Sequence, residues 1–302
     1  MTTGTRRPRG PATGRPGAVW ALPGALFFAL FAVVPMVLVA YLSFTDWDGL
    51  ATPAPTGLDN WTRLVADPVM RQAVVLSLAL TAATWAVQTP IALLLGVWAA
   101  GPQRNRAVLS AVFFFPLLLS SAAIAVLWKS LLDPNFGPVA RISDALGMGS
   151  GNILGTSTGA FTAVVFVSAW QFIPLHALLY QGGARQIPAV LYQAAEVDGA
   201  GRLLRFRHIT LPQLRATITT SSVLMVVGAL TYFDTVLILT QGGPGTDTTI
   251  VPYLMFWTGF RGYELGYASA IAFTLVVVAT TASLLMVRLT GFGAMRSTRE
   301  GM

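Results

Sequence analysis

Cysteine is missing from this chain of 302 residues, and charged residues make up only 10% of it. Without cysteine the chain has no disulfide bridges, thiolate nucleophiles or cysteine-based metal and iron–sulfur sites. The two histidines, His176 and His208, are too far apart in the sequence to form a local metal pair. Lysine occurs once, at Lys129, and no Gly-x-x-x-x-Gly-Lys-Ser/Thr phosphate-binding loop is present. The sequence therefore predicts no catalytic residues, no metal site, no bound cofactor and no ATP hydrolysis by the chain itself.

Apolar residues take the place of the missing charge and make up 54% of the sequence. A soluble domain carries about 25% charged residues, so this composition predicts a membrane protein. The formal net charge is +7, but the basic residues lie between long apolar runs rather than on one polar face. This distribution favours a signal for membrane orientation over a nucleic-acid site.

Six apolar runs are long enough to cross a bilayer, which needs roughly 20 helical residues. They lie at about Ala18–Phe44, Ala73–Ala100, Val108–Leu132, Phe161–Gln181, Ile218–Thr240 and Tyr267–Leu289. The first run follows four arginines, as a secretory signal does, but it is too long for one and lacks a clear cleavage site. The predicted fold is an all-α membrane protein with six transmembrane helices, in one domain over residues 18–302. The Arg-, Pro- and Gly-rich residues 1–17 are expected to be a disordered tail.

The basic residues are unevenly divided between the two sides of this arrangement. With the amino terminus in the cytoplasm, the inside segments hold fourteen of the nineteen basic residues. Cytoplasmic loops of membrane proteins carry such an excess of arginine and lysine. An even number of spans then places both termini in the cytoplasm.

The inside segment between predicted spans four and five, about residues 184–215, contains the densest cluster of arginine. Pro188 suits the first turn of a helix, and Gly199 can end that helix. The following GRLLRFRHIT is basic and amphipathic, and Leu211–Pro212 is expected to break it before span five. Two short helices meeting at a glycine give a compact surface for another protein. The alternative is a hairpin on anionic lipid headgroups, with Arg202, Arg205 and Arg207 contacting phosphates.

The spacing in this segment resembles the signature of permease subunits of ATP-binding-cassette importers. That signature runs Glu-Ala-Ala, three residues, Gly, nine residues, Ile, one residue, Leu-Pro, and the matching residues here are Ala194, Ala195, Gly199, Ile209, Leu211 and Pro212. Asp198-Gly199-Ala200 matches the Asp-Gly-Ala that is common in the sugar-transporting branch. The resemblance implies that residues 184–215, hereafter the coupling loop, insert into a cleft on a separate ATPase subunit. The family's leading Glu is Gln193 here, which puts any ion pair of that Glu in doubt; whether Glu196 replaces it is left open.

A second stretch, Leu239–Phe273, resembles the outside loop and sixth span of maltose- and glycerol-phosphate-type permeases. The matching residues are Thr240, Gly242, Gly243, Pro244, Thr248 and the run Gly266–Ala270. They resemble the subunit usually encoded first of a pair, and the terminal RLTGFGAMRSTREGM lacks the tail typical of the companion. The resemblance implies that Gly242, Gly243 and Pro244 meet a solute-binding protein.

The family resemblance also implies a set of partners and a location. The partners are a second homologous permease subunit, a cytoplasmic ATPase dimer that binds ATP and Mg, an extracytoplasmic solute-binding protein, a carbohydrate substrate and membrane lipid. The location is the bacterial inner membrane, and the fold is that of a type I importer permease. Nucleic acid is not among the expected partners.

Asp234 is the one carboxylate predicted within the hydrocarbon, where a charge costs about 2.5–3.5 kcal/mol. Asp234 is therefore expected to face a wet cavity or a partner. With Tyr232, Phe233 and Gln171 it forms the candidate substrate pathway; Gln88 and His176 are further candidates, with packing as their default role. Two alternatives stay open: an ion-coupled secondary transporter that uses Asp234, and a lipid-linked transferase that uses Glu196 and Asp198.

Overall fold

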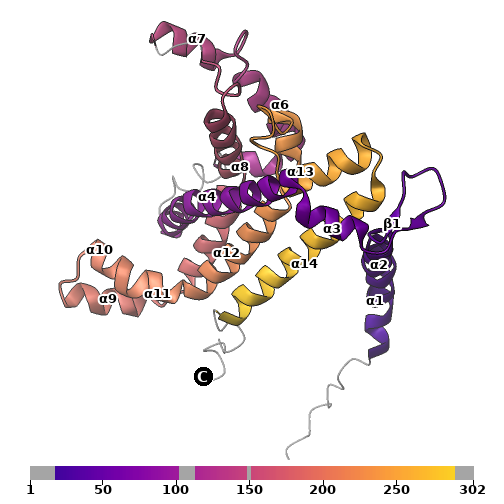
Figure 1. The fold of residues 1–302 in the computed structure, drawn as a ribbon. Helices are drawn as coiled ribbons and strands as arrows, with labels where there is room; N and C mark the ends of the chain where they lie inside the picture. Colours follow the sequence, from indigo (N-terminus) through magenta and orange to yellow (C-terminus); the bar gives the residue numbers. More distant parts are fainter. Residues whose placement is uncertain (1–17, 102–112, 148–150, 290–302) are drawn as a thin grey trace, which may run out of the picture.

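The computed structural model describes residues 18–101, 113–147 and 151–289, and nearly all of its elements are helices (Figure 1). The elements in chain order are η1 (Ala18–Ala21), α1 (Leu22–Phe28), η2 (Ala29–Val33), α2 (Val34–Leu42), β1 (Thr45–Asp46), β2 (Ala54–Pro55), α3 (Asp59–Ala66), α4 (Pro68–Ala99), η3 (Phe115–Leu118), α6 (Ser121–Leu131), α7 (Pro138–Ala145), α8 (Ser157–Arg185), α9 (Ala189–Val197), α10 (Arg202–Arg205), η4 (Phe206–Thr210), α11 (Leu211–Gln213), α12 (Arg215–Leu230), η5 (Val236–Thr240), α13 (Val251–Phe256), η6 (Trp257–Arg261) and α14 (Leu265–Leu289). The two strands pair antiparallel, with Thr45 opposite Pro55.

The all-α prediction is confirmed. The predicted tail 1–17 and the terminal segment used to assign the subunit lie outside the described residues.

Four described helices are long and apolar enough to cross a membrane: Val19–Leu42, Pro68–Ala99, Ser157–Arg185 and Leu265–Arg288. A fifth is added if the bent pair Arg202–Gln213 and Arg215–Leu230, with 68° between its halves, counts as one span. These helices correspond to predicted spans one, two, four, five and six. The predicted number of six is therefore not confirmed.

The third predicted span, Val108–Leu132, is not one continuous helix. Residues 108–112 lie outside the described part, and the remainder divides into η3 and the eleven-residue α6. Pro116 lies inside η3, the backbone is extended at Leu119, and Ser120 caps α6 by accepting a hydrogen bond from the N–H of Ala123 at 3.2 Å. A proline and a capping serine thus start a new helix where hydropathy alone predicted continuity.

The fifth predicted span, Ile218–Thr240, is also interrupted, which corrects the prediction of one helix. α12 ends at Leu230, and helical structure resumes only at Asp234, just before η5. Thr231 donates its hydroxyl hydrogen bond back to the carbonyl of Val227 at 2.9 Å. Such bonds bend helices, and the nearby Gly228 lowers helix propensity further. The break places Tyr232 in non-helical backbone in the middle of the bundle.

The centre of the fold is the contact between α4 and α8, which small residues make close. A Cβ atom added at Gly96 would lie 2.6 Å from the carbonyl oxygen of Ala177. Ala92, Ala169 and Ala177 are buried at the same interface. Close backbone approach at small residues is the usual way in which membrane helices pack. In contrast, α1 and α2 stand to one side of the bundle in Figure 1, and their side chains are largely exposed, with Phe27 of α1 65% and Val37 of α2 62% exposed.

Candidate functional site

The coupling loop extends away from the helical bundle as a hairpin of α9 against α10, η4 and α11 (Figure 1). Helix α9 begins after Pro188, which occupies the N-cap rather than the predicted first turn, and ends at Val197, with Asp198 as the C-cap. The hydroxyl groups of Tyr192 and Thr210 lie 2.9 Å apart and join the two sides of the hairpin. The predicted pair of short helices is present.

Gly199 ends α9 in the way that its motif position requires. Its φ of +77° lies in the left-handed region, which glycine adopts at little cost. The N–H of Gly199 donates to the carbonyl of Glu196 at 3.1 Å, and the N–H of Ala200 donates to that of Ala195 at 2.8 Å. These two bonds satisfy carbonyl groups that a helix end leaves without partners.

The motif residues divide into those that shape the hairpin and those that face outward. Ala195, Ala200 and Ile209 are half-buried and line a shallow groove of about 230 Å³ between the two sides. The others are exposed: Gln193, Ala194, Glu196, Asp198, Gly199, Leu211 and Pro212. Exposed apolar side chains adjoin them, with Val197 89% and Leu203 80% exposed. An apolar patch bordered by polar groups is typical of a protein contact surface.

Glu196 and Gln193 differ in their surroundings. One carboxylate oxygen of Glu196 lies 3.4 Å from a guanidinium nitrogen of Arg205, across the hairpin, and the Glu196 side chain is 71% exposed. Glu196 is therefore already engaged within the loop. It lies three residues beyond Gln193, so the two side chains are neighbours on the surface of α9.

The predicted break at Leu211–Pro212 is two residues too early. The helix continues through Pro212 to Gln213 and bends by 68° where α12 begins. A proline in a helix removes one hydrogen bond and crowds the preceding turn. Here a wider π turn, η4, precedes the proline, and the N–H of Leu211 donates to the carbonyl of Phe206. The wider turn accommodates the ring, so the bend falls after it.

A cavity of about 190 Å³ lies between α4, α8 and α12, at the middle of predicted spans two, four and five. Its polar lining residues are Thr84, Gln88, Ser168, His176 and Tyr232. Gln88 donates to the hydroxyl of Ser168 at 3.3 Å. His176 Nδ1 lies 2.9 Å from the hydroxyl of Ser221. Polar side chains gathered between membrane helices are costly there and mark pathways for polar substrates. We call this space the central cavity.

Only one of the four predicted pathway residues lines the central cavity, namely Tyr232. Phe233 packs against Phe256, with ring centroids 5.2 Å apart. Gln171 is buried and donates to the hydroxyl of Ser121 at 2.9 Å. Asp234 is exposed on the surface of the chain and does not line the central cavity. The break after Leu230 lies directly before Tyr232, Phe233 and Asp234, and these three side chains point in different directions.

Sequence reasoning missed Thr84 and Ser168, which face the central cavity beside Gln88. Single hydroxyl residues are common in membrane helices because they can bond to the preceding turn. Their residue types alone therefore did not indicate a cavity. The four-residue spacing of Thr84 and Gln88, which places both on one face of α4, is the sequence pattern that could have identified them.

The loop of residues 241–250 closes the end of the bundle at which α4 and α8 begin. We call this end the outer end, because it is the one predicted to face outside. Gly242, which has a φ of +80°, Gly243 and Pro244 form its turn. Asp247 accepts hydrogen bonds from the hydroxyl of Ser157 and, at 3.4 Å, from the amide of Gln72. The loop that contains the predicted binding-protein contact is thus tied to both α8 and α4.

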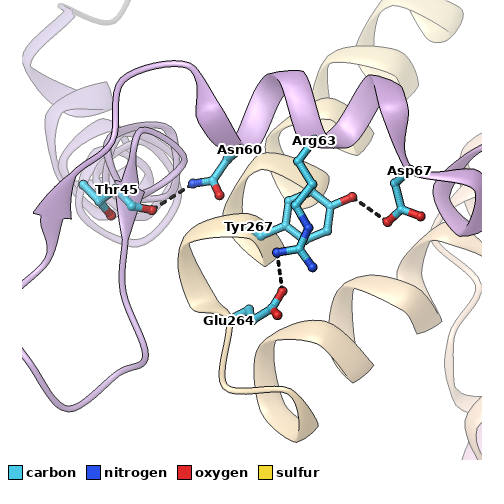
Figure 2. A network of polar contacts seen from close by, with 6 residues as sticks. All are labelled: Thr45, Asn60, Arg63, Asp67, Glu264 and Tyr267. Atoms are coloured by element: carbon cyan, nitrogen blue, oxygen red, sulfur yellow. Dashed lines mark hydrogen bonds and ion pairs between the residues drawn. The ribbon is translucent and has the colours of Figure 1, made fainter.

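A second polar network joins α3 to the start of α14 at the outer end (Figure 2). Arg63 pairs with Glu264 at 2.7 Å, and its guanidinium carbon lies 4.0 Å from the centroid of the Tyr267 ring. The hydroxyl of Tyr267 donates to Asp67 at 2.9 Å. Asn60 donates to the carbonyl of Thr45 at 2.8 Å, which links the network to the β-hairpin. Sequence analysis did not predict this network, since α3 and α14 are about 200 residues apart in the chain.

Comparison with known proteins identifies the family. Residues 92–291 match the family described as "Binding-protein-dependent transport system inner membrane component". The chain belongs to this family. This part of the chain includes α8, the coupling loop, both halves of the interrupted fifth span and α14. As an inner membrane component of such a system, the chain is the membrane-spanning permease and not the ATPase.

Individual relatives of this permease extend the match over most of its length. A probable ABC transporter permease of Bacillus subtilis is 32% identical over 270 residues, which are 87% of this chain and 92% of the relative. The diacetylchitobiose uptake system permease protein of Streptomyces coelicolor is 29% identical over 291 residues, which are 90% of this chain and 82% of the relative. A crystal structure of a bacterial ABC transporter that imports the acidic polysaccharide alginate has a chain with the same fold. The two chains superpose with a TM-score of 0.79 and are 21% identical in sequence. The superposition covers 90% of this chain and 93% of the chain in the alginate transporter.

Family membership decides between the open alternatives. Inner membrane components of binding-protein-dependent systems are permeases of ATP-driven importers, so the ion-coupled carrier and the lipid-linked transferase are not supported. The resemblance identified from Ala194–Pro212 and Leu239–Phe273 is confirmed at the level of the family.

Proposed function

We propose that this permease and a second homologous subunit together enclose a pathway through which a carbohydrate moves inward, with ATP and Mg bound by a cytoplasmic ATPase dimer. The observation that carries this proposal is the coupling loop, which combines an importer signature with an exposed, partly apolar surface beyond the bundle. The diacetylchitobiose uptake permease, similar over 90% of this chain, supports a carbohydrate substrate.

The coupling loop is proposed to enter a cleft on the ATPase with the tip between Val197 and Leu203. The tip combines two strongly exposed apolar side chains with the small, exposed Gly199. Burial of an exposed valine or leucine contributes about 1.5–3 kcal/mol. Gln193 can accept and donate hydrogen bonds at this surface, but it cannot supply the ion pair of the family's Glu. The Glu196–Arg205 pair holds the two sides of the hairpin together while the tip is engaged.

Movement of the ATPase subunits would reach the pathway through the bend at Leu214. The coupling loop is continuous with α12 across this 68° bend, and Leu214 itself is buried against α8. Rotation of the loop would therefore move α12, which forms one wall of the central cavity. ATP binding on the partner would drive this rotation and open the cavity outward, and hydrolysis would reset it.

The central cavity is proposed to contact the carbohydrate. None of the described residues that line it carries a fixed charge, and they offer hydroxyl, amide and imidazole groups. No described residue donates to the side-chain amide oxygen of Gln88, so this oxygen is available to a sugar hydroxyl. Such a lining favours a neutral saccharide over an anionic one, because a buried charge without a partner is costly. At about 190 Å³ the cavity is below the usual range of about 300–1,000 Å³ for ligand sites, as expected for half of a shared pathway.

Asp234 is proposed to face the second permease subunit. It is exposed on this chain but lies beside the buried Tyr232, within a predicted span. A carboxylate in that position requires water or a partner group.

The outer loop at Gly242, Gly243 and Pro244 is proposed to contact the solute-binding protein. Both termini of the chain are proposed to lie in the cytoplasm. The chain is proposed to be the first of the two permease subunits.

The proposal is tested by co-purification of the tagged chain from its native membrane, with Gly199→Arg as the variant. Wild type is expected to bring down a cytoplasmic ATPase and a second multi-span subunit. The variant should lose the ATPase and retain the second subunit, because Gly199 is exposed at the tip and far from the bundle. Gly57→Arg is the matched control, since Gly57 is also exposed in open space with a left-handed φ of +62°, but lies at the outer end, in the loop before α3. Purification of wild type without an ATPase would contradict the proposal.

A further inference from the structure

The outer end holds a second cavity, of about 520 Å³, between α3, the 241–250 loop, α13, η6 and the start of α14. We call it the outer pocket. Its volume lies within the usual range for small-molecule sites, about 300–1,000 Å³. Neither the family match nor the sequence motifs assign a role to it.

Three aromatic side chains line the outer pocket: Tyr253, Trp257 and Tyr267. Tyr253 and Tyr267 are buried, and each donates its hydroxyl hydrogen bond to the protein, to the carbonyl of Gln241 at 2.7 Å and to Asp67 at 2.9 Å. Their ring positions are therefore fixed. Trp257 is 51% exposed. The Arg261 guanidinium carbon lies 5.7 Å from its ring centroid and the Tyr253 ring 6.1 Å from it, and the remaining exposed part of the indole is open to a ligand. Rigid aromatic surfaces provide large contact areas with little loss of side-chain entropy.

The charges at the pocket are paired within the protein. Arg63 is held by Glu264 at 2.7 Å and by the face of Tyr267 at 4.0 Å, as Figure 2 shows. Asp67 accepts hydrogen bonds from the N–H of Val69 at 2.8 Å and from the hydroxyl of Tyr267. Arg63 is ion-paired and Asp67 already accepts two hydrogen bonds, so neither group is left without a partner for a charged ligand. The pocket therefore favours a neutral ligand.

Hydrogen-bonding groups complete the lining. Gln241 and Thr258 lie in it, and Gln241 occupies the left-handed region with a φ of +52°. For the side-chain amide of Gln241 and the hydroxyl of Thr258, no hydrogen-bond partner occurs among the residues that the structure describes. Open aromatic surface together with amide and hydroxyl groups matches the chemistry of a saccharide, which has apolar C–H faces and many hydroxyl groups.

One apolar cluster shares a residue with each of the two cavities. Val236, Leu239 and Ile250 are buried in this cluster. Tyr253 belongs both to the cluster and to the outer pocket, while Tyr232 belongs to the cluster and to the central cavity. A ligand in the outer pocket therefore lies next to a cluster that also borders the central cavity.

We infer that the outer pocket is a binding site for a neutral saccharide, which occupies it before passing into the central cavity. This inference rests on the proposed function, because it takes the transported carbohydrate as the ligand. Trp257 provides the stacking surface, Gln241 and Thr258 bind hydroxyl groups, and Arg63, already paired with Glu264, is not free to bind an anion.

The test uses the whole transporter in proteoliposomes, with diacetylchitobiose and maltose as probes. Trp257→Ala is the main variant, and Thr258→Val removes a hydroxyl group at nearly constant shape. Phe260→Ala is the matched control, because Phe260 is 65% exposed on the same helical segment but does not line the pocket. For the imported probe, Trp257→Ala should raise the half-saturating concentration for uptake about three- to tenfold, which corresponds to the loss of one aromatic contact. The maximal rate should be unchanged, and Trp257→Phe should restore much of the loss.

Two further measurements separate the possible failures. If wild type imports neither these probes nor any other carbohydrate, the proposed function fails. If wild type imports a probe and Trp257→Ala behaves like Phe260→Ala, the inference is overturned while the proposed function stands. Docking of the sugar-free binding protein is measured in parallel. If Trp257→Ala weakens that docking as much as it weakens uptake, the pocket is a protein contact and the inference is overturned.

Discussion

Gly199 allows a sharp test of how the coupling loop works. A valine there would place a β-branched residue at a φ of +77°, in the left-handed region. An added Cβ would meet nothing within 4 Å, so crowding does not contribute. The cost is about 1–2 kcal/mol from backbone sterics alone. This strain would weaken the two hydrogen bonds that end α9, from the N–H of Gly199 to the carbonyl of Glu196 and from the N–H of Ala200 to the carbonyl of Ala195.

Gly201 provides the control, because it is also in open space but has a φ of −68° and extended backbone, which valine accepts. We expect Gly199→Val to reduce transport-coupled ATP hydrolysis in the reconstituted complex about 5- to 30-fold, the factor that 1–2 kcal/mol represents. Gly201→Val should behave like wild type. Size-exclusion chromatography checks that both variants are produced intact. Equal activity of the two variants, whether high or low, would refute the argument from backbone conformation.

Three further changes test the packing of the bundle and its outer end. Gly96→Ala should destabilise the protein by about 1–3 kcal/mol, because the added Cβ would meet the backbone of α8. Gly182→Ala is the control and should not destabilise it, since a Cβ there would meet nothing within 4 Å. Thermal unfolding in detergent measures both variants. Asp247→Asn should cost about 1 kcal/mol in the 241–250 loop and speed hydrogen exchange there, while exchange in the coupling loop stays constant. Gly266→Ala should release the β-hairpin from α14, since its Cβ would overlap the carbonyl oxygen of Thr45, and protease cleavage near that hairpin should increase. Unchanged cleavage would show that the hairpin adapts.

The coupling loop could be predicted because its structure depends on local signals. Gly199, the helix before it and the basic segment after it are adjacent in the sequence, and each signal acts within a few residues. The error at Pro212 arose because the effect of proline was taken alone. The preceding π turn at Phe206–Thr210, which accommodates the ring, has no clear sequence pattern.

The long spans were predicted from hydropathy, but the interruptions were not. The breaks after Leu118 and Leu230 depend on capping and back-bonding by Ser120 and Thr231, and such residues also occur inside continuous membrane helices. The direction of Asp234 depends on the second break, so its exposure could not be predicted either.

The outer pocket was not predictable from a single sequence. Its polar network joins Arg63 and Asp67 to Glu264 and Tyr267, and these pairs become neighbours only when the whole chain has folded. Each residue alone suggests an ordinary loop or helix end.

The central claim is that the coupling loop meets a cytoplasmic ATPase, and the absence of native cysteine makes it directly measurable. A single cysteine is introduced at Val197, 89% exposed at the loop tip, or at Leu50, 91% exposed beside the β-hairpin. Each variant is treated in membranes of the native strain with a thiol-reactive photocrosslinker. The account predicts that Val197→Cys crosslinks to the ATPase and resists an impermeant maleimide in intact cells, whereas Leu50→Cys is labelled from outside and does not reach the ATPase. Labelling of Val197→Cys from outside, or a crosslink to lipid alone, would contradict the account.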